Sequence, residues 1–190
     1  MAMLRRLLPL LAAGTLVGTG CGYNTIQTKD EAVNAAGSQI KTQLQRRADL
    51  IPNLVETVKG FAKQETTIFI RVAEARSRLN TAVQGGNLQE MATANAALNA
   101  PLGRLLATVE NYPELKSNQN FLQLQDQLEG TENRISVARQ DYNRAVEDFN
   151  AYIRRFPYNL TAKITGHGKP REYFELTAPG AAEAPKVKFP

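Results

Sequence analysis

Hydrophobic residues recur along most of the chain with the period of a helix. Between Lys29 and Val83 they follow each other at steps of three and four, which is the spacing of one helix face and not of a strand. The stricter part of this stripe is Ile51, Leu54, Val58, Phe61, Glu65, Ile68, Val72, Ala75, Leu79 and Ala82, and a looser part precedes it at Val33, Ala36, Ile40, Leu44 and Ala48. We expect one long helix. It should be kinked at Pro52, because proline removes a backbone donor and clashes with the preceding turn; the alternative is a restart there with Asp49 as the cap.

Two further helices are predicted after Gly85 and Gly86, which end the first because glycine readily adopts left-handed backbone angles. Asn87, followed by Glu90, is a capping arrangement for the second helix. Pro101 and Gly103 predict a bend or a break in it near Asn99. The third helix should open at Ser117 and end at Pro157, with a stripe in heptad register: Phe121, Leu124, Leu128, Thr131, Ile135, Ala138, Tyr142, Ala145, Phe149, Tyr152 and Phe156.

The short connections between these helices require neighbours to run antiparallel. No stretch alternates in the manner of a strand. The pattern therefore predicts an all-α fold, an up-and-down antiparallel bundle of three to four long helices spanning residues 29–165. Residues 166–190 are rich in Gly, Pro, Ala and Lys, which predicts a flexible C-terminal tail.

The N-terminus has the layout of a secretory signal. Arg5 and Arg6 precede an apolar run that is too short to cross a bilayer as a helix, and small residues lead up to Cys21. This junction resembles a bacterial lipobox, although Gly18 stands where Leu is commonest. We expect residues 1–20 to be a lipoprotein-type signal peptide and residues 21–28 an anchor and short linker, with Cys21 carrying acyl chains such as palmitate. The alternative is a free Cys21 thiol and an N-terminus retained as a membrane segment.

This interpretation fixes a predicted location. A lipid-anchored protein would sit at the cell membrane or envelope and face away from the cytoplasm. In a Gram-negative host the predicted site is the periplasmic face of the outer membrane, because Gly22 is not the Asp associated with inner-membrane retention.

Charge argues against nucleic acid as a partner. The chain has 23 Lys and Arg against 18 Asp and Glu, but without Arg5 and Arg6 the body has 21 against 18, a balance of only +3. The adjacent pairs Arg46–Arg47 and Arg154–Arg155 each spread over about 100° of a helix, so solvated faces explain them better than a basic stripe does. The basic residues near the C-terminus, Lys163, Lys169, Arg171, Lys186 and Lys188, leave a weak option of contact with anionic lipids.

The sequence contains few residues that could carry out catalysis. One Cys and one His exclude a Cys/His zinc site, a disulfide framework and a Cys–His nucleophile pair. Glu65 could hold a metal with other carboxylates, but a ferritin-like site also needs His in the bundle, so a Glu paired with a basic residue or reaching solvent is the simpler interpretation. His167 is most simply an exposed loop residue. We predict no catalytic residues, no cofactor and no metal.

Several runs together resemble the LemA family. They are Gly22–Asn24 with Asp30–Glu31; Gln45–Val55 with Thr57–Phe61 and Glu65; Glu110–Lys116; Leu124–Gln125; Gly130–Ile135; Ala138–Arg139; and Phe156–Pro157 with Asn159–Leu160. The resemblance covers residues 22–165. Gly37 departs from it, where Trp is expected, and so does the run from Pro101 to Gly103.

The resemblance implies a helical bundle attached to the envelope by its N-terminus, with no established enzymatic activity and no agreed binding site. The run from Arg46 to Val55 has two interpretations. It could bind a partner, or it could be structural, with Ile51, Leu54 and Val55 filling the core and Arg47 and Asp49 bridging to neighbouring helices.

Three functions remain open from the sequence. The first is a non-enzymatic, membrane-anchored scaffold or adaptor that binds unidentified envelope proteins. The second is a self-assembling structural protein that supports or shapes the membrane as a homo-oligomer, for which long heptad stripes are suited. The third is a carboxylate-metal enzyme using Glu65.

Overall fold

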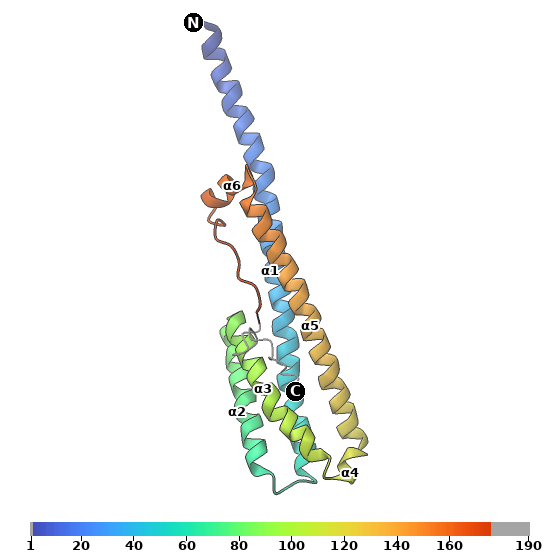
Figure 1. Cartoon of the computed structure of the whole chain (residues 1–190). Coiled ribbons are helices and arrows are strands. Elements are labelled where there is room, and N and C mark those ends of the chain that lie inside the picture. The colour runs from blue at the N-terminus through green and yellow to red at the C-terminus, as the bar shows by residue number, and fades with distance from the viewer. Residues whose placement is uncertain (1, 176–190) are drawn as a thin grey trace, which may run out of the picture. The chain divides into compact units, whose positions relative to one another are not determined.

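The computed structural model describes the backbone of residues 2–175 and the side chains of residues 22–175. In that part of the chain every regular element is a helix: α1 (Ala2–Lys59), α2 (Thr66–Gly85), α3 (Leu88–Val109), α4 (Pro113–Lys116), α5 (Gln119–Arg154) and α6 (Tyr158–Ile164) (Figure 1). This confirms the predicted all-α fold. The chain forms two compact units, and α1 and α5 each contribute to both.

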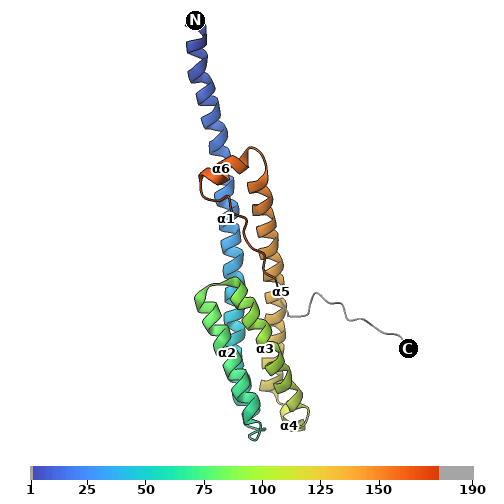
Figure 2. The same ribbon diagram turned by 60° about the vertical axis from the view of Figure 1, so that its left-hand side comes forward.

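One unit comprises residues 39–138 and the segment from Phe174. Here the C-terminal part of α1, then α2, α3 and the first part of α5 run alternately in opposite directions, with α4 in the last connection, as both views show (Figures 1 and 2). The predicted antiparallel up-and-down arrangement is therefore present. The larger apolar side chains that fill this core include Ile40, Leu44, Ile51, Leu54, Val72, Leu79, Leu98, Leu105, Leu115 and Ile135.

The other unit comprises residues 2–38 and 139–173. The first part of α1 packs here against the last part of α5, with α6 and the segment that follows it alongside (Figure 2). Its buried side chains are Ile26, Val33, Tyr142, Val146, Phe149, Asn150, Ile153, Thr161 and Ala162.

The helix boundaries differ from the prediction between Pro52 and Glu65. Helix α1 continues through Pro52 to Lys59, and the chain then turns through residues 60–65 before α2 begins. The predicted single long helix is wrong, because α2 runs back antiparallel to α1. The apolar stripe predicted for one helix is divided between the two. Within the turn Phe61 is partly exposed, while Ala62 and Phe69 take the inward positions.

Proline is also accommodated inside α3, which continues through Pro101, so the alternative of a break near Asn99 is wrong. The glycine and capping predictions are confirmed. Gly86 ends α2 with a φ of 76°, and the Asn87 side chain accepts hydrogen bonds from the backbone N–H groups of Gln89 and Glu90.

The heptad stripe of α5 is largely confirmed. Phe121, Thr131, Ile135, Ala138, Tyr142 and Phe149 are all buried. Two details are corrected. Asn118, and not Ser117, caps the helix by accepting hydrogen bonds from the backbone of Asn120 and Phe121, and the stripe stops before Phe156, which lies beyond the helix end and is 81% exposed.

Within the described residues, no helix combines the length and the apolar character needed to span a membrane. The predicted lipidation site Cys21 lies in α1, but its side chain is outside the described residues. Of the predicted tail, Lys186 and Lys188 also lie outside them.

A candidate binding groove on helix α1

Arg47 is buried in the core of the unit formed by residues 39–138, with 7% of its surface exposed. Its Nη1 donates to Asn95 Oδ1 at 2.6 Å and its Nη2 to Asn99 Oδ1 at 2.9 Å, both on α3. Nη1 also lies 2.6 Å from Glu132 Oε2 on α5. The expectation that Arg47 bridges neighbouring helices is confirmed, and its assignment to a solvated face is wrong.

Burial disfavours the positive charge of Arg47, and its neighbours partly compensate. Burial lowers the pKa of the guanidinium from its ordinary value, and the negative charge of Glu132 raises it again. Arginine keeps its proton in proteins, so the buried cation depends on these partners. Sequence reasoning missed Asn95, Asn99 and Glu132. Asn95 and Asn99 stand four residues apart in an Ala-rich helix, which places two polar side chains on one face.

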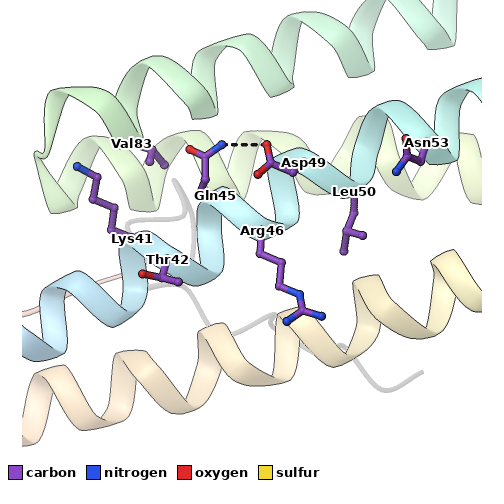
Figure 3. Close-up of a pocket in the computed structure, with 8 residues that line it drawn as sticks. All are labelled: Lys41, Thr42, Gln45, Arg46, Asp49, Leu50, Asn53 and Val83. Carbon is purple, nitrogen blue, oxygen red and sulfur yellow. Dashed lines mark hydrogen bonds between the residues drawn. The ribbon is translucent and has the colours of Figure 1, made fainter.

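The opposite side of the same run of α1 lines an open groove. The groove has a volume of about 670 Å³ and is lined by Lys41, Thr42, Gln45, Arg46, Asp49, Leu50, Asn53 and Val83 (Figure 3). We call it the α1 groove. All its lining residues belong to α1 except Val83, which comes from the end of α2. The Arg76 side chain fixes α2 against α1 nearby by donating from Nε to the Ala48 carbonyl at 2.8 Å.

The charged side chains in the α1 groove are exposed, and only some of them have a partner. Gln45 Nε2 donates to Asp49 Oδ1 at 2.9 Å within the helix (Figure 3). Among the described residues Asp49 forms no ion pair with another helix, so the predicted bridge is not found there. Lys41 and Arg46 are exposed and pair with no residue in the described part of the chain. Leu50 is half-buried between these polar groups. The groove therefore offers two cations and one carboxylate beside a small apolar surface.

A second open groove, of about 500 Å³, lies between α2 and α3. Its lining is mostly small or hydroxyl-bearing side chains, such as Ser77, Thr81, Thr93 and Ala97, with Arg78 and Glu90 at its edge. One cation and one carboxylate balance here, whereas the α1 groove has two cations against one carboxylate.

The residues considered for chemistry do not come together. Glu65 lies in the turn before α2 and not in a helical stripe. His167 is half-buried, with Nε2 3.4 Å from Gln27 Nε2 and Nδ1 3.2 Å from Thr165 Oγ1. Arg154 and Arg155 are exposed, as predicted. In the described part of the chain no group of three His, Cys, Asp or Glu side chains could hold a metal ion.

The segment after α6 is bound to the helices by backbone contacts that the sequence did not suggest. Asn150 Nδ2 donates to the Arg171 carbonyl at 2.9 Å, and Arg171 N donates back to Asn150 Oδ1 at 2.8 Å. Tyr142 Oη donates to the Glu172 carbonyl at 3.0 Å, and Arg171 Nη2 lies 2.7 Å from Asp30 Oδ1. The first residues of the predicted tail therefore pair with both α1 and α5.

Burial also affects the Tyr142 hydroxyl. It raises the pKa of Tyr142 above the ordinary value. The positive charge of Arg171 lowers the pKa and the negative charge of Glu172 raises it, each by less than burial does.

Comparison with known proteins shows which family and which individual proteins this chain is similar to. The model of the LemA family matches residues 36–189. Magnetosome protein MamQ 2 of Paramagnetospirillum magneticum is 31% identical over 176 residues, which cover 80% of this chain and 64% of that protein. Magnetosome protein MamQ of Magnetospirillum gryphiswaldense is 28% identical over 175 residues, with the same coverage.

A more distant relative is Protein LemA of Metamycoplasma hominis, which is 23% identical over 144 residues, covering 74% of this chain and 63% of that protein. The chain thus spans somewhat less than two thirds of the length of these relatives. None of their names describes a catalytic activity.

Proposed function

Because the chain belongs to the LemA family, we propose that it is a membrane-attached, non-enzymatic module of the bacterial cell envelope that binds partner proteins through the α1 groove. The module is a helical scaffold or adaptor. Attachment is through acyl chains on Cys21, and the bundle faces away from the cytoplasm, at the periplasmic side of the outer membrane in a Gram-negative host. The names of the MamQ relatives as magnetosome proteins support association with a membrane.

The observation that carries the proposal is the division of the run from Arg46 to Val55 into two faces. Arg47, Ala48, Ile51, Leu54 and Val55 are buried, and packing accounts for them. Packing does not account for the outward residues of the same run, and it is these that line the α1 groove. The structural interpretation of this family-like run therefore explains one half of it, and a binding role explains the other.

The chemistry of the groove suggests the kind of partner. The exposed cations Lys41 and Arg46 would pair with carboxylates, and the half-buried Leu50 would contact an apolar side chain. The Asp49 carboxylate lies in the same groove and accepts a hydrogen bond from Gln45, so the lining has two cations and one anion. We infer that the partner presents an acidic and apolar segment of an envelope protein.

A crosslinked pull-down tests this function. Envelopes of cells that express the tagged wild type, or the double variant Lys41→Glu/Arg46→Glu, are crosslinked, and the captured proteins are quantified by mass spectrometry. The matched control is Arg71→Glu/Arg134→Glu, which reverses two exposed charges outside the groove. We expect reproducible partners to be lost about tenfold in the groove variant and kept in the control. No reproducible partner, or equal loss in both variants, contradicts the proposal.

The alternative of a self-assembling structural protein is less well supported. Self-assembly would need apolar stripes that remain exposed and can pack against another copy of the chain. The longest stripe is covered by the chain itself at Phe121, Ile135, Tyr142 and Phe149. Sedimentation of the detergent-solubilised full chain separates the two functions. A monomer across a wide concentration range argues against assembly.

A further inference from the structure

Three large apolar side chains are exposed on α6 and the turn before it. Leu160 and Ile164 are four residues apart in α6 and lie on one side of that helix, and Phe156 stands in the turn that precedes it. Their exposed fractions are 81%, 52% and 84%, and Phe156 and Ile164 are the two most exposed large apolar residues in the described part of the chain. We call this set the α6 stripe. Large exposed apolar side chains gathered on one short segment mark a contact surface.

The opposite face of α6 is fixed against α1 at its predicted anchor point. Thr161 and Ala162 are buried, and the Tyr158 ring stacks on Tyr152 with centroids 4.4 Å apart. Gly22 is approached so closely that a methyl group on it would lie 2.8 Å from Tyr158 Cδ1. Gly22 directly follows Cys21 in the sequence, so the contact of α6 with α1 is next to the proposed anchor residue. Figures 1 and 2 show α6 beside α1.

The charge around the α6 stripe has one sign. Between Asp148 and Glu172 the sequence contains no acidic residue, whereas it contains five basic ones: Arg154, Arg155, Lys163, Lys169 and Arg171. The first four are exposed and form no ion pair within the described residues, while Arg171 pairs with Asp30. Basic residues beside exposed apolar side chains are the composition of segments that lie in the interface of an anionic membrane.

We propose that the α6 stripe is a second membrane contact, with Phe156, Leu160 and Ile164 at the boundary of the acyl chains and the flanking basic side chains on anionic lipid headgroups. The inference rests on the membrane attachment proposed above and adds a surface to it. Attachment at residue 21 alone would leave the bundle free to tilt. A second contact on α6 restricts the tilt of the unit formed by residues 2–38 and 139–173, because Gly22 and α6 pack together within it.

The chain contains no Trp, which permits a position-specific test. Single Trp residues are introduced as Leu160→Trp or Ile164→Trp in the full chain, which is reconstituted into phosphatidylethanolamine–phosphatidylglycerol vesicles that contain brominated lipid. The matched control is Ile70→Trp, on an α2 position that is 58% exposed. We expect bromine quenching at positions 160 and 164 to exceed that at position 70 by about threefold or more. Equal quenching at all three positions overturns the inference.

Flotation of the same vesicles separates the two proposals. A chain that floats but leaves positions 160 and 164 unquenched contradicts the α6 contact alone. A chain that does not float contradicts the membrane attachment and the α6 contact together. Circular dichroism of each variant confirms that the helices are intact. Exchanging phosphatidylglycerol for a zwitterionic lipid should lower quenching at position 160 by about twofold, and unchanged quenching contradicts the role of the basic residues.

Discussion

Arg47 on α1 and Glu132 on α5 form an ion pair with 2.6 Å between Nη1 and Oε2, although the arginine is buried and the Glu132 side chain is 47% exposed. The buried cation is thus held by one partner that still reaches solvent, together with the amide oxygens of Asn95 and Asn99. This cluster connects three helices. It also fixes the inward face of α1, whose outward face lines the α1 groove.

Replacing Arg47 by Met should destabilise the bundle by about 2–4 kcal/mol, because it leaves the two amide oxygens without their donor and the Glu132 carboxylate without its partner. The adjacent Arg46→Met provides the matched control and should change the free energy of unfolding by less than about 0.5 kcal/mol, since Arg46 is exposed. Urea denaturation measures both values. Similar effects of the two substitutions would contradict the assignment of Arg47 as a structural cation.

Replacing Asn150 by Leu should release the segment after α6. The substitution removes both hydrogen bonds to the Arg171 backbone, and we expect a loss of about 2 kcal/mol. Hydrogen exchange of the Arg171 amide should accelerate more than that of the α2 amides. Asn133→Leu, at an exposed position of α5, is the control and should leave Arg171 protected.

The raised pKa of Tyr142 predicts a loss of stability at alkaline pH. The unfolded chain ionises this hydroxyl at a pH near 10, while the folded chain holds it neutral to a higher pH. The stabilisation is therefore complete below the unfolded pKa and declines as the pH rises through the folded pKa. In Tyr142→Phe, thermal denaturation should show a smaller decline in this range, together with a loss of about 1 kcal/mol at neutral pH from the missing hydrogen bond to Glu172. An unchanged alkaline profile would contradict this role.

Replacing Cys21 by Ala should move the protein out of the membrane fraction or leave it unprocessed. Acyl chains each add about 0.8 kcal/mol of membrane binding per buried CH₂ group, so their loss is decisive for attachment. Globomycin should have the same effect on processing. Mass spectrometry of the N-terminal peptide of the native protein should show a chain that begins at an acylated Cys21. A peptide that retains Arg5 and Arg6 would contradict the cleavage.

The sequence predicted the fold from periodicity, which remains visible because buried positions such as Val72, Leu79, Ile135 and Phe149 repeat at helical spacing. It misplaced the end of the first helix because Phe61 and Glu65 continue the same spacing through a turn. Periodicity records which residues are apolar, and it does not record where the chain reverses.

The continuation of a helix through Pro52 was predicted correctly, whereas the alternative of a break at Pro101 gave proline too much weight. A proline within a helix costs about 3 kcal/mol, and α1 contains Pro52 without ending there. Its neighbours Ala48, Ile51, Leu54 and Val55 are all buried, so packing on both sides of the proline offsets the cost.

The candidate site was predictable in part. The run from Gln45 to Val55 stood out by its resemblance to the LemA family, but its division into a buried and an exposed face depended on which helices surround it. Arg46 and Arg47 are adjacent in sequence and lie on different sides of α1, one exposed and one buried. The partners of Arg47 lie 48 to 85 residues further along the chain, so no local pattern reveals them.

The most direct test of the proposed function is photocrosslinking from Asn53, which lines the α1 groove. A photoreactive amino acid at this position in living cells should form one reproducible adduct with an envelope protein, and Arg46→Glu should abolish it. The same probe at exposed Val137, outside the groove, should not form that adduct. The absence of any adduct from position 53, or an adduct that is unaffected by Arg46→Glu, would contradict partner binding in the groove.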